Sequence, residues 1–264
     1  MVLFTLAVLA IVAAVDVVLM LAFGGLGPDA TTTDTLGALL TSTVVTLGII
    51  GCASLFRTAS LRAGGAAVAQ QLGATPVTAS DSSGYVVDDA GIDVDLLSQI
   101  KETERARISE YVARRPGARF VEGARPWSVP VDIAIPSATQ NELDESDAHA
   151  LIANGVRAVA EGANMPCTPG AVGAFQEADV LFGPGKAANA GGVATSALEM
   201  SQNAARQRWS FDDSEAKLRA IMKDVHDAAF DAAARYGRPG DYVVGANSAG
   251  FERVAHAMLA QGVI

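Results

Sequence analysis

A glycine- and alanine-rich stretch carries the residue types most suited to holding a ligand; it runs GPGKAANAGGVATSALEMSQN over Gly183–Asn203. Small side chains let a backbone approach a ligand or a second helix closely, because no Cβ bulk intervenes. The alanine-rich run 193–205 predicts a helix, and its start at Gly191–Gly192 would direct free N–H groups toward a carboxylate or a phosphate. The pattern is equally typical of a tight turn that packs a small-residue helix against its neighbour. Polar groups are spaced through the stretch at Lys186, Asn189, Ser196 and Asn203.

Short apolar runs that end in polar motifs predict an α/β domain from residue 71 onward. The strand-like runs are Thr75–Ala79, Val131–Ile135, Arg157–Ala160 and Val180–Phe182. Helical spacing of apolar residues occurs at Val94–Val112, after Asp144 or Ser146 as far as Asn154–Gly155, at Asp212–Tyr236 and at Gly250–Gln261. An open parallel sheet binds its ligands at the carboxyl ends of its strands, where these polar motifs would gather. We therefore expect an incomplete Rossmann-like parallel sheet with flanking helices.

The SDSSG motif at Ser80–Gly84 follows the first of these strands. In a dinucleotide-binding fold, Asp81 in this place could hold the ribose hydroxyls of the adenosine, and Ser82 could bond to a 2′-phosphate. The same residues also favour an Asx turn.

Two further strands end in amide-bearing loops, ATQN at Ala138–Asn141 and EGANMP at Glu161–Pro166. Small and amide side chains at Ala138, Thr139 and Gln140 could bond to the ribose on the nicotinamide side of a cofactor while leaving its ring room. Asn164 offers a donor and an acceptor to the carboxamide region. Each of these side chains could instead cap a loop end.

Composition excludes several classes of partner. The net charge of −10 argues against nucleic acid, because the phosphates would be repelled. Two cysteines give neither a disulfide framework nor zinc-ligand spacing, and three distant histidines fit structural positions. We expect no metal site.

The first 56 residues are almost free of charge. Met1–Phe23 and Leu36–Phe56 are each long enough to cross a bilayer as a helix. Arg57 and Arg62 follow the second run, which predicts a transmembrane hairpin with a cytoplasmic C-terminal part. A cleaved signal peptide is the alternative for the first run, and Val44–Ile50 as a first sheet strand is the alternative for the second. We divide the chain into a membrane hairpin and linker, 1–70, and a nucleotide-binding domain with C-terminal helices, 71–264.

Five motifs in the same order resemble the hexameric glutamate dehydrogenases of the Glu/Leu/Phe/Val dehydrogenase family. They are SDSSG, RPW at Arg125–Trp127, ATQNELD at Ala138–Asp144, EGANMP, and the glycine-rich stretch. The likeness covers about Gln71–Ile264, the cofactor domain and C-terminal part of such an enzyme. The N-terminal 70 residues are weakly similar to the leader of M48-type zinc metallopeptidases, but no HExxH motif is present, so a peptidase is excluded.

The dehydrogenase resemblance implies particular roles. Ser82 and a lysine on the next helix, placed at Lys101, are associated with NADP use, although NAD is possible. Val193 and Ser196 match positions that contact glutamate. The resemblance also implies L-glutamate and 2-oxoglutarate as ligands, and a homo-oligomer, a hexamer in the family. The family carries its catalytic Lys and Asp in a domain that this chain lacks, and no GxGxxG turn precedes Gln71, so we assign no catalytic residue here.

Two hypotheses about function follow. The first is an NADP-dependent glutamate dehydrogenase, truncated or fused, with impaired oxidative deamination of glutamate. The alternative is a membrane-anchored module that binds a nucleotide or a partner without catalysis. The expected location is the membrane with a cytoplasmic C-terminal domain, or the cytoplasm if the leader is an accidental join near residue 70.

Overall fold

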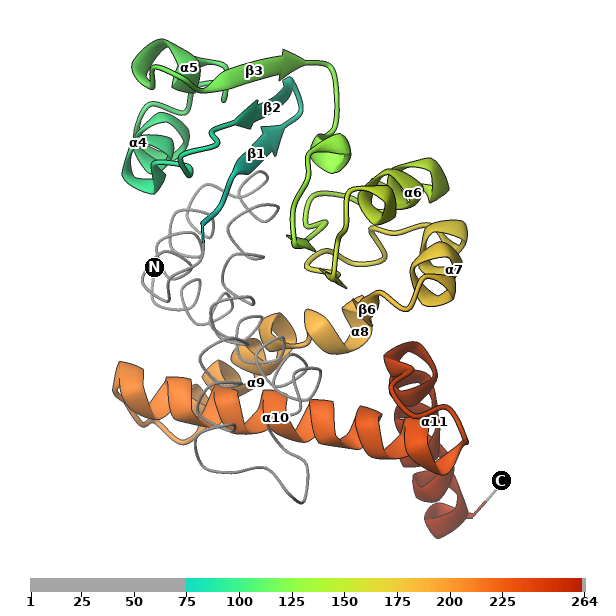
Figure 1. The fold of residues 1–264 in the computed structure, drawn as a ribbon. Helices are drawn as coiled ribbons and strands as arrows, with labels where there is room; N and C mark the ends of the chain where they lie inside the picture. Colours follow the sequence, from blue (N-terminus) through green and yellow to red (C-terminus); the bar gives the residue numbers. More distant parts are fainter. Residues whose placement is uncertain (1–74, 263–264) are drawn as a thin grey trace, which may run out of the picture.

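The computed structural model describes residues 75–262, which form two three-stranded sheets and a set of C-terminal helices (Figure 1). Figure 1 shows the first sheet with α4 and α5 on one side of the molecule, and α6 and α7 on the other. The long helix α10 crosses the base.

The first sheet is antiparallel, in the order β1 (Thr78–Asp81), β2 (Gly84–Val87), β3 (Arg119–Glu122). Asp81 pairs with Gly84, so Ser82 and Ser83 form a two-residue hairpin loop. Gly84 has φ +148°, and a Cβ there would lie 2.2 Å from the carbonyl oxygen of Val121, so only glycine lets β3 approach. Between β2 and β3 the chain forms α4 (Val94–Ser98), a π-helical turn η2 (Gln99–Thr103) and α5 (Glu110–Arg114). These pieces cover a core of their own, centred on Ile92, Leu97, Ile100, Ile108 and Tyr111.

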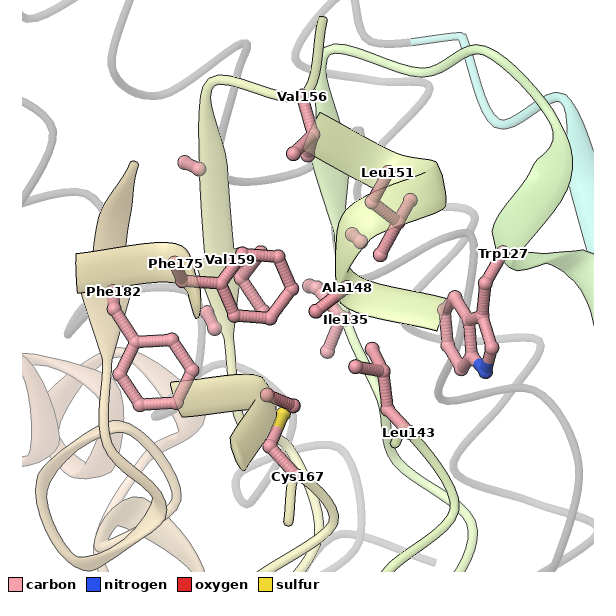
Figure 2. Packing of buried hydrophobic residues seen from close by; sticks show 14 of the residues in the cluster. Trp127, Ile135, Leu143, Ala148, Leu151, Val156, Val159, Cys167, Phe175 and Phe182 are labelled. Atoms are coloured by element: carbon pink, nitrogen blue, oxygen red, sulfur yellow. The ribbon is translucent and has the colours of Figure 1, made fainter. Parts of the chain in front are cut away.

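The second sheet is parallel, in the order β4 (Ile133–Ala134), β5 (Ala158–Ala160), β6 (Leu181–Gly183). Its crossover helices are α6 (Glu145–Ala153), capped by Asp144, and α7 (Pro169–Glu177), capped by Thr168. The 3-10 turn η3 (Pro126–Ser128) leads into the sheet. Figure 2 shows the core of this unit, with Trp127 at one end and Phe182 at the other. Phe175 is fully buried and stacks on Phe182 with ring centroids 5.9 Å apart.

The C-terminal helices are α8 (Gly185–Ala188), α9 (Gly191–Ala204), α10 (Phe211–Arg235) and α11 (Tyr242–Gln261). Helices α10 and α11 pack tightly because Gly245 has no side chain: a Cβ there would lie 2.0 Å from the carbonyl oxygen of Ala229. The buried imidazole of His226 on α10 lies 3.1 Å from the hydroxyl of Tyr242 on α11.

The α/β class and the parallel sheet with flanking helices are confirmed, and the strands expected near residues 131–135, 157–160 and 180–182 are the three strands of that sheet. The expected strand Thr75–Ala79 is shifted to Thr78–Asp81 and, contrary to prediction, belongs to the antiparallel sheet. The strand is antiparallel because it forms a hairpin with β2, a strand that was not predicted from the sequence.

A single helix over Val94–Val112 was wrong as a prediction. The helix breaks after η2, where Arg105 has φ +53°. The physical reason is Asp81, whose carboxylate accepts a hydrogen bond from the backbone N–H of Ile108 at 3.1 Å. An N–H committed in this way is not available for the i−4 carbonyl of a continuous helix.

The predicted transmembrane hairpin, the leader resemblance and the boundary at residue 70 lie outside the described residues. Within 75–262, no helix combines the length and the apolar character that crossing a bilayer requires.

Candidate functional site

The loops that follow β4 and β5 are joined by backbone hydrogen bonds at the carboxyl edge of the parallel sheet. The N–H of Asn141 donates to the carbonyl of Met165, and that of Leu143 to the carbonyl of Pro166, both at 3.0 Å. The ladder continues at Thr168, whose N–H donates to Leu143. The two amide-bearing motifs of the sequence, ATQN and EGANMP, therefore lie side by side, as their position after neighbouring strands predicts.

These loops approach closely because of Gly162. Its N–H donates to the carbonyl of Pro136 at 3.0 Å, and a Cβ would lie 2.1 Å from the hydroxyl oxygen of Ser137. Asn141 and Met165 adopt left-handed backbone conformations, with φ of 56° and 54°. Such conformations are costly for residues other than glycine and persist where surrounding bonds hold them.

A buried carboxylate holds the third loop, after β6, in the same place. Glu161 is 6% exposed. Its Oε1 accepts from the N–H of Cys167 at 3.1 Å, and its Oε2 from the N–H of Gly185 at 2.6 Å. Bonds from backbone N–H groups to a carboxylate are strong and offset the cost of burying the charge. Glu161 therefore fixes the start of α8 against the EGANMP loop.

The sequence-predicted residues on these loops differ in exposure and in how many hydrogen bonds they make within residues 75–262. Gln140 and Asn164 are exposed, while Ala138 and Thr139 are half-buried. Within residues 75–262, the side chains of Thr139 and Gln140 make no hydrogen bond, and Asn164 uses only its oxygen, which accepts from Asn189 Nδ2 at 2.8 Å. The N–H of Ala138 is taken by the carboxylate of Glu142 at 2.6 Å. Within the described residues, the side chains of Thr139 and Gln140 and the NH₂ group of Asn164 are thus left without a hydrogen-bond partner.

Arg125, of the RPW motif, links the loop after β4 to the start of α6. Its guanidinium donates to the carbonyl of Glu142 at 2.5 Å and to Asp144 at 3.1 Å, and it pairs with Asp147 at 3.1 Å. Hydrogen bonds from Ser146, Asp147 and Arg125 lower the pKa of Asp144 to about 2. Arg125 therefore ties the start of α6 to the loop that carries Thr139, a role that the sequence reading did not assign.

Asp81 lies in the antiparallel unit, away from the parallel sheet on which we expected it. Its side chain is 3% exposed. One oxygen accepts from the N–H and hydroxyl of Ser83, at 2.8 and 2.5 Å, and the other from Lys101 Nζ at 2.8 Å and from Ile108. Burial would raise the pKa of Asp81, but these hydrogen bonds outweigh it and lower the pKa to about 2. A carboxylate has about four acceptor positions, and all four are used.

The ammonium group of Lys101 also makes hydrogen bonds within the protein. Besides Asp81 it donates to the carbonyl of Ala106 at 3.0 Å, and its side chain is 16% exposed. Ser82 and Arg107 remain at the surface beside this pair, and Arg107 Nη1 donates to the Ser82 hydroxyl at 2.7 Å. Sequence reasoning missed Arg107, because the break in the predicted helix is what brings it to the hairpin loop.

Helix α9 presents Val193 and Ser196 on its exposed face, with Val193 71% exposed. The Ser196 hydroxyl donates to the carbonyl of Gly192 at 3.3 Å, so its oxygen can still accept a hydrogen bond from a ligand, whereas donating to a ligand requires the hydroxyl to rotate. Lys186 bonds Asn247 on α11 and orders the loop rather than facing the strand edge. No group of three His, Cys, Asp or Glu side chains suited to a metal ion occurs in the described part of the chain.

Comparison with known proteins gives a consistent result. Residues 63–262 match the model of the Glutamate/Leucine/Phenylalanine/Valine dehydrogenase family. The NADP-specific glutamate dehydrogenase of Escherichia coli (strain K12) is 56% identical over 199 residues, which are 74% of this chain and 44% of that protein. The glutamate dehydrogenase of Bacteroides thetaiotaomicron is 51% identical over 201 residues, again 74% and 44% of the two chains.

Solved structures agree. The chain is similar to a glutamate dehydrogenase with TM-score 0.81 and 33% identity, covering 100% of this chain and 55% of that one. Glutamate dehydrogenase of Plasmodium falciparum gives TM-score 0.78 and 31% identity, covering 97% and 52%. The chain thus spans about half the length of the relatives it matches.

Proposed function

Because the chain belongs to the Glutamate/Leucine/Phenylalanine/Valine dehydrogenase family, we propose that it binds a pyridine nucleotide at the carboxyl edge of β4–β6. The observation that carries this proposal is the trio of loops held together by Glu161 and by the Asn141–Met165 bond. Among the described residues they leave the side chains of Thr139 and Gln140, and the NH₂ group of Asn164, available to meet the nicotinamide side of the cofactor. Bound there, the cofactor would supply hydride transfer.

The cofactor is NADP rather than NAD in this proposal. A carboxylate that binds ribose hydroxyls must have acceptor positions free for them. Those of Asp81 are filled by Ser83, Lys101 and Ile108. Ser82 and Arg107 offer a hydroxyl and a guanidinium at the surface, which suit a 2′-phosphate. This assigns the phosphate to Arg107 in place of Lys101, and it agrees with relatives that are NADP-specific by name.

The reaction we propose is that of the relatives, the reversible oxidative deamination of L-glutamate to 2-oxoglutarate and ammonia. Val193 and Ser196 on α9 would meet the substrate, the valine by packing and the serine through its hydroxyl. The catalytic Lys and Asp that the resemblance places in another domain have no counterpart among the site residues. Because acid–base catalysis needs such groups, we propose that this stretch of chain by itself binds the nucleotide with little or no turnover. The homo-oligomer expected from the resemblance stays part of this proposal.

A titration of the full chain with NADPH, followed by nucleotide fluorescence, tests the proposal, together with an assay of glutamate-dependent NADP reduction. Saturable binding without turnover is the expected result. Removal of a charge-assisted hydrogen bond costs about 1.5–3 kcal/mol, so R107M should weaken NADPH binding about ten- to hundredfold and leave NADH binding unchanged. A wild-type chain that binds neither nucleotide would overturn the proposal, and robust turnover would refute the non-catalytic part. Native mass spectrometry tests the homo-oligomer.

The membrane anchor predicted for residues 1–56 concerns a part of the chain outside the described residues. We propose it as a separate point, with the nucleotide-binding part in the cytoplasm. Fractionation of cells that express the full chain tests it, since recovery in the soluble fraction without detergent would contradict an anchor.

A further inference from the structure

We propose that Asn189 is a positioning residue, which turns Asn164 so that its amide nitrogen, and not its oxygen, points into the nucleotide site. The proposal concerns the polarity of the group offered to the ligand and rests on the proposed function. It assigns a role to Asn189 that neither its place in the glycine-rich stretch nor its burial indicates.

The orientation of Asn189 is fixed by a carbonyl. One end of its amide lies 3.0 Å from the backbone oxygen of Ala163. The two ends of an asparagine amide have nearly the same shape, so their identity must follow from their partners. A backbone carbonyl can only accept a hydrogen bond. The end that faces Ala163 is therefore the NH₂ group, Nδ2.

The same nitrogen then decides the orientation of Asn164. The second hydrogen of Asn189 Nδ2 points to Asn164 at 2.8 Å. Only an oxygen can receive it, so Asn164 turns its Oδ1 toward Asn189 and its own NH₂ group away. Within the described residues that NH₂ group makes no hydrogen bond, and Asn164 is exposed. The site thus presents two N–H donors, which suit a carboxamide or ribose oxygen.

The geometry around Asn189 is held rigidly. Its backbone N–H donates to the carbonyl of Gly185 at 2.9 Å, and the N–H of Gly185 is bound by the buried Glu161. A Cβ at Gly185 would lie 3.0 Å from the Ala163 oxygen and 3.4 Å from Asn189 Nδ2. The two loops therefore approach as closely as a missing side chain permits. Such support makes the orientation of Asn164 pre-organised rather than induced by a ligand.

Substitutions at position 189 separate orientation from simple loop order. In N189D the carboxylate cannot donate, so the amide of Asn164 reverses, gives its NH₂ group to the carboxylate, and presents an oxygen to the ligand. In N189A nothing orients Asn164, which can still turn its NH₂ group to a ligand. N189D should therefore bind NADPH more weakly than N189A, by about tenfold, because a donor has been replaced by an acceptor.

The experiment is a double-mutant cycle on the full chain with NADPH as the probe. The variants are N189A, N189D, N164A, N164A/N189A and N164A/N189D. With no amide left at position 164, the two changes at 189 should differ by less than about twofold, the scatter expected of uncoupled sites. A difference between N189D and N189A that persists in the N164A background would show that Asn189 acts on the loop and not through Asn164, and would overturn the inference.

A second measurement needs no nucleotide. Hydrogen exchange of the side-chain amides, read by NMR, should be slow for the NH₂ group of Asn189 and fast for that of Asn164. In N189D the NH₂ group of Asn164 should become protected. Protection of Asn164 in the unmodified chain would refute its orientation even if NADPH binds. Failure of NADPH to bind would instead refute the proposed function, while the amide exchange still decides the inference.

Discussion

Replacing Asp81 by asparagine should destabilise the chain in a way that depends on pH. The pKa of Asp81 is lowered to about 2 in the folded protein, against 3.8 for the free side chain. Each unit of pKa difference corresponds to about 1.4 kcal/mol. The ionised carboxylate therefore contributes about 2 kcal/mol to the free energy of unfolding at neutral pH. Because its folded pKa is the lower one, this contribution is full above pH 4 and is lost as the pH falls from about 4 to about 2.

The variant D81N also leaves the ammonium group of Lys101 partly buried without its carboxylate partner. The side chain of Lys101 is 16% exposed and would keep only the carbonyl of Ala106 as a partner. Removing one partner of a fully buried pair costs about 3–5 kcal/mol. Because Lys101 keeps some solvent and one partner, the expected loss at pH 7 is smaller, about 2–4 kcal/mol. The double variant D81N/K101M, which removes both charges, should lose less than the sum of the single changes.

The assay is urea unfolding of the full chain, followed by circular dichroism, for the unmodified chain, D81N, K101M and the double variant. The measured quantity is the difference in unfolding free energy between the unmodified chain and D81N at pH 7 and at pH 3. Comparison with D81N isolates Asp81 from other carboxylates that titrate in acid. A difference below about 0.5 kcal/mol at pH 7, the size of an ordinary surface change, would refute the account of Asp81 as a saturated buried partner. So would a difference that does not shrink in acid.

Further predictions concern packing around the site. Phe175→Ala should lower the free energy of unfolding by about 3–5 kcal/mol, because the ring is fully buried; thermal unfolding against the unmodified chain tests this. Trp127→Phe should cost less than its size suggests, since the buried indole N–H has no partner in the described residues, and an unfolding loss above about 3 kcal/mol would contradict it. Gly162→Ala should destabilise the loops and be partly rescued by Ser137→Gly, because the added Cβ would lie 2.1 Å from the Ser137 hydroxyl. Gly173→Ala is the matched control: nothing lies within 4 Å of its Cβ on α7, so it should be neutral or raise stability by up to about 1 kcal/mol.

The parallel sheet and its loops could be predicted from the sequence because each signal is local. An apolar run followed by ATQN or EGANMP marks a strand and the loop after it, and Asp144 marks the start of α6 with a capping box. The contact between the two loops follows from the geometry of parallel strands.

The antiparallel unit could not be predicted in the same way, because its shape depends on contacts distant in sequence. Asp81 binds the N–H of Ile108, twenty-seven residues later, and this contact ends the helix that periodicity predicts through residue 112. The placement of Arg107 beside Ser82 follows from that break. A one-dimensional pattern of apolar residues contains no signal for a carboxylate that replaces a helical hydrogen bond.

The bonds that hold the candidate site use mostly backbone groups. Most of the side chains proposed to bind a ligand are therefore not the groups that hold the loops together. The links at Asn141–Met165, Leu143–Pro166 and Glu161–Gly185 do not use the side chains of Thr139, Gln140 or Asn164. Thr139 and Gln140 can therefore change what the site recognises without loosening the loops that carry them, whereas Asn164 also bonds to Asn189 on the third loop. The bonds that hold these loops lie within residues 125–189, so in the described part of the chain the candidate site is held by its own loops.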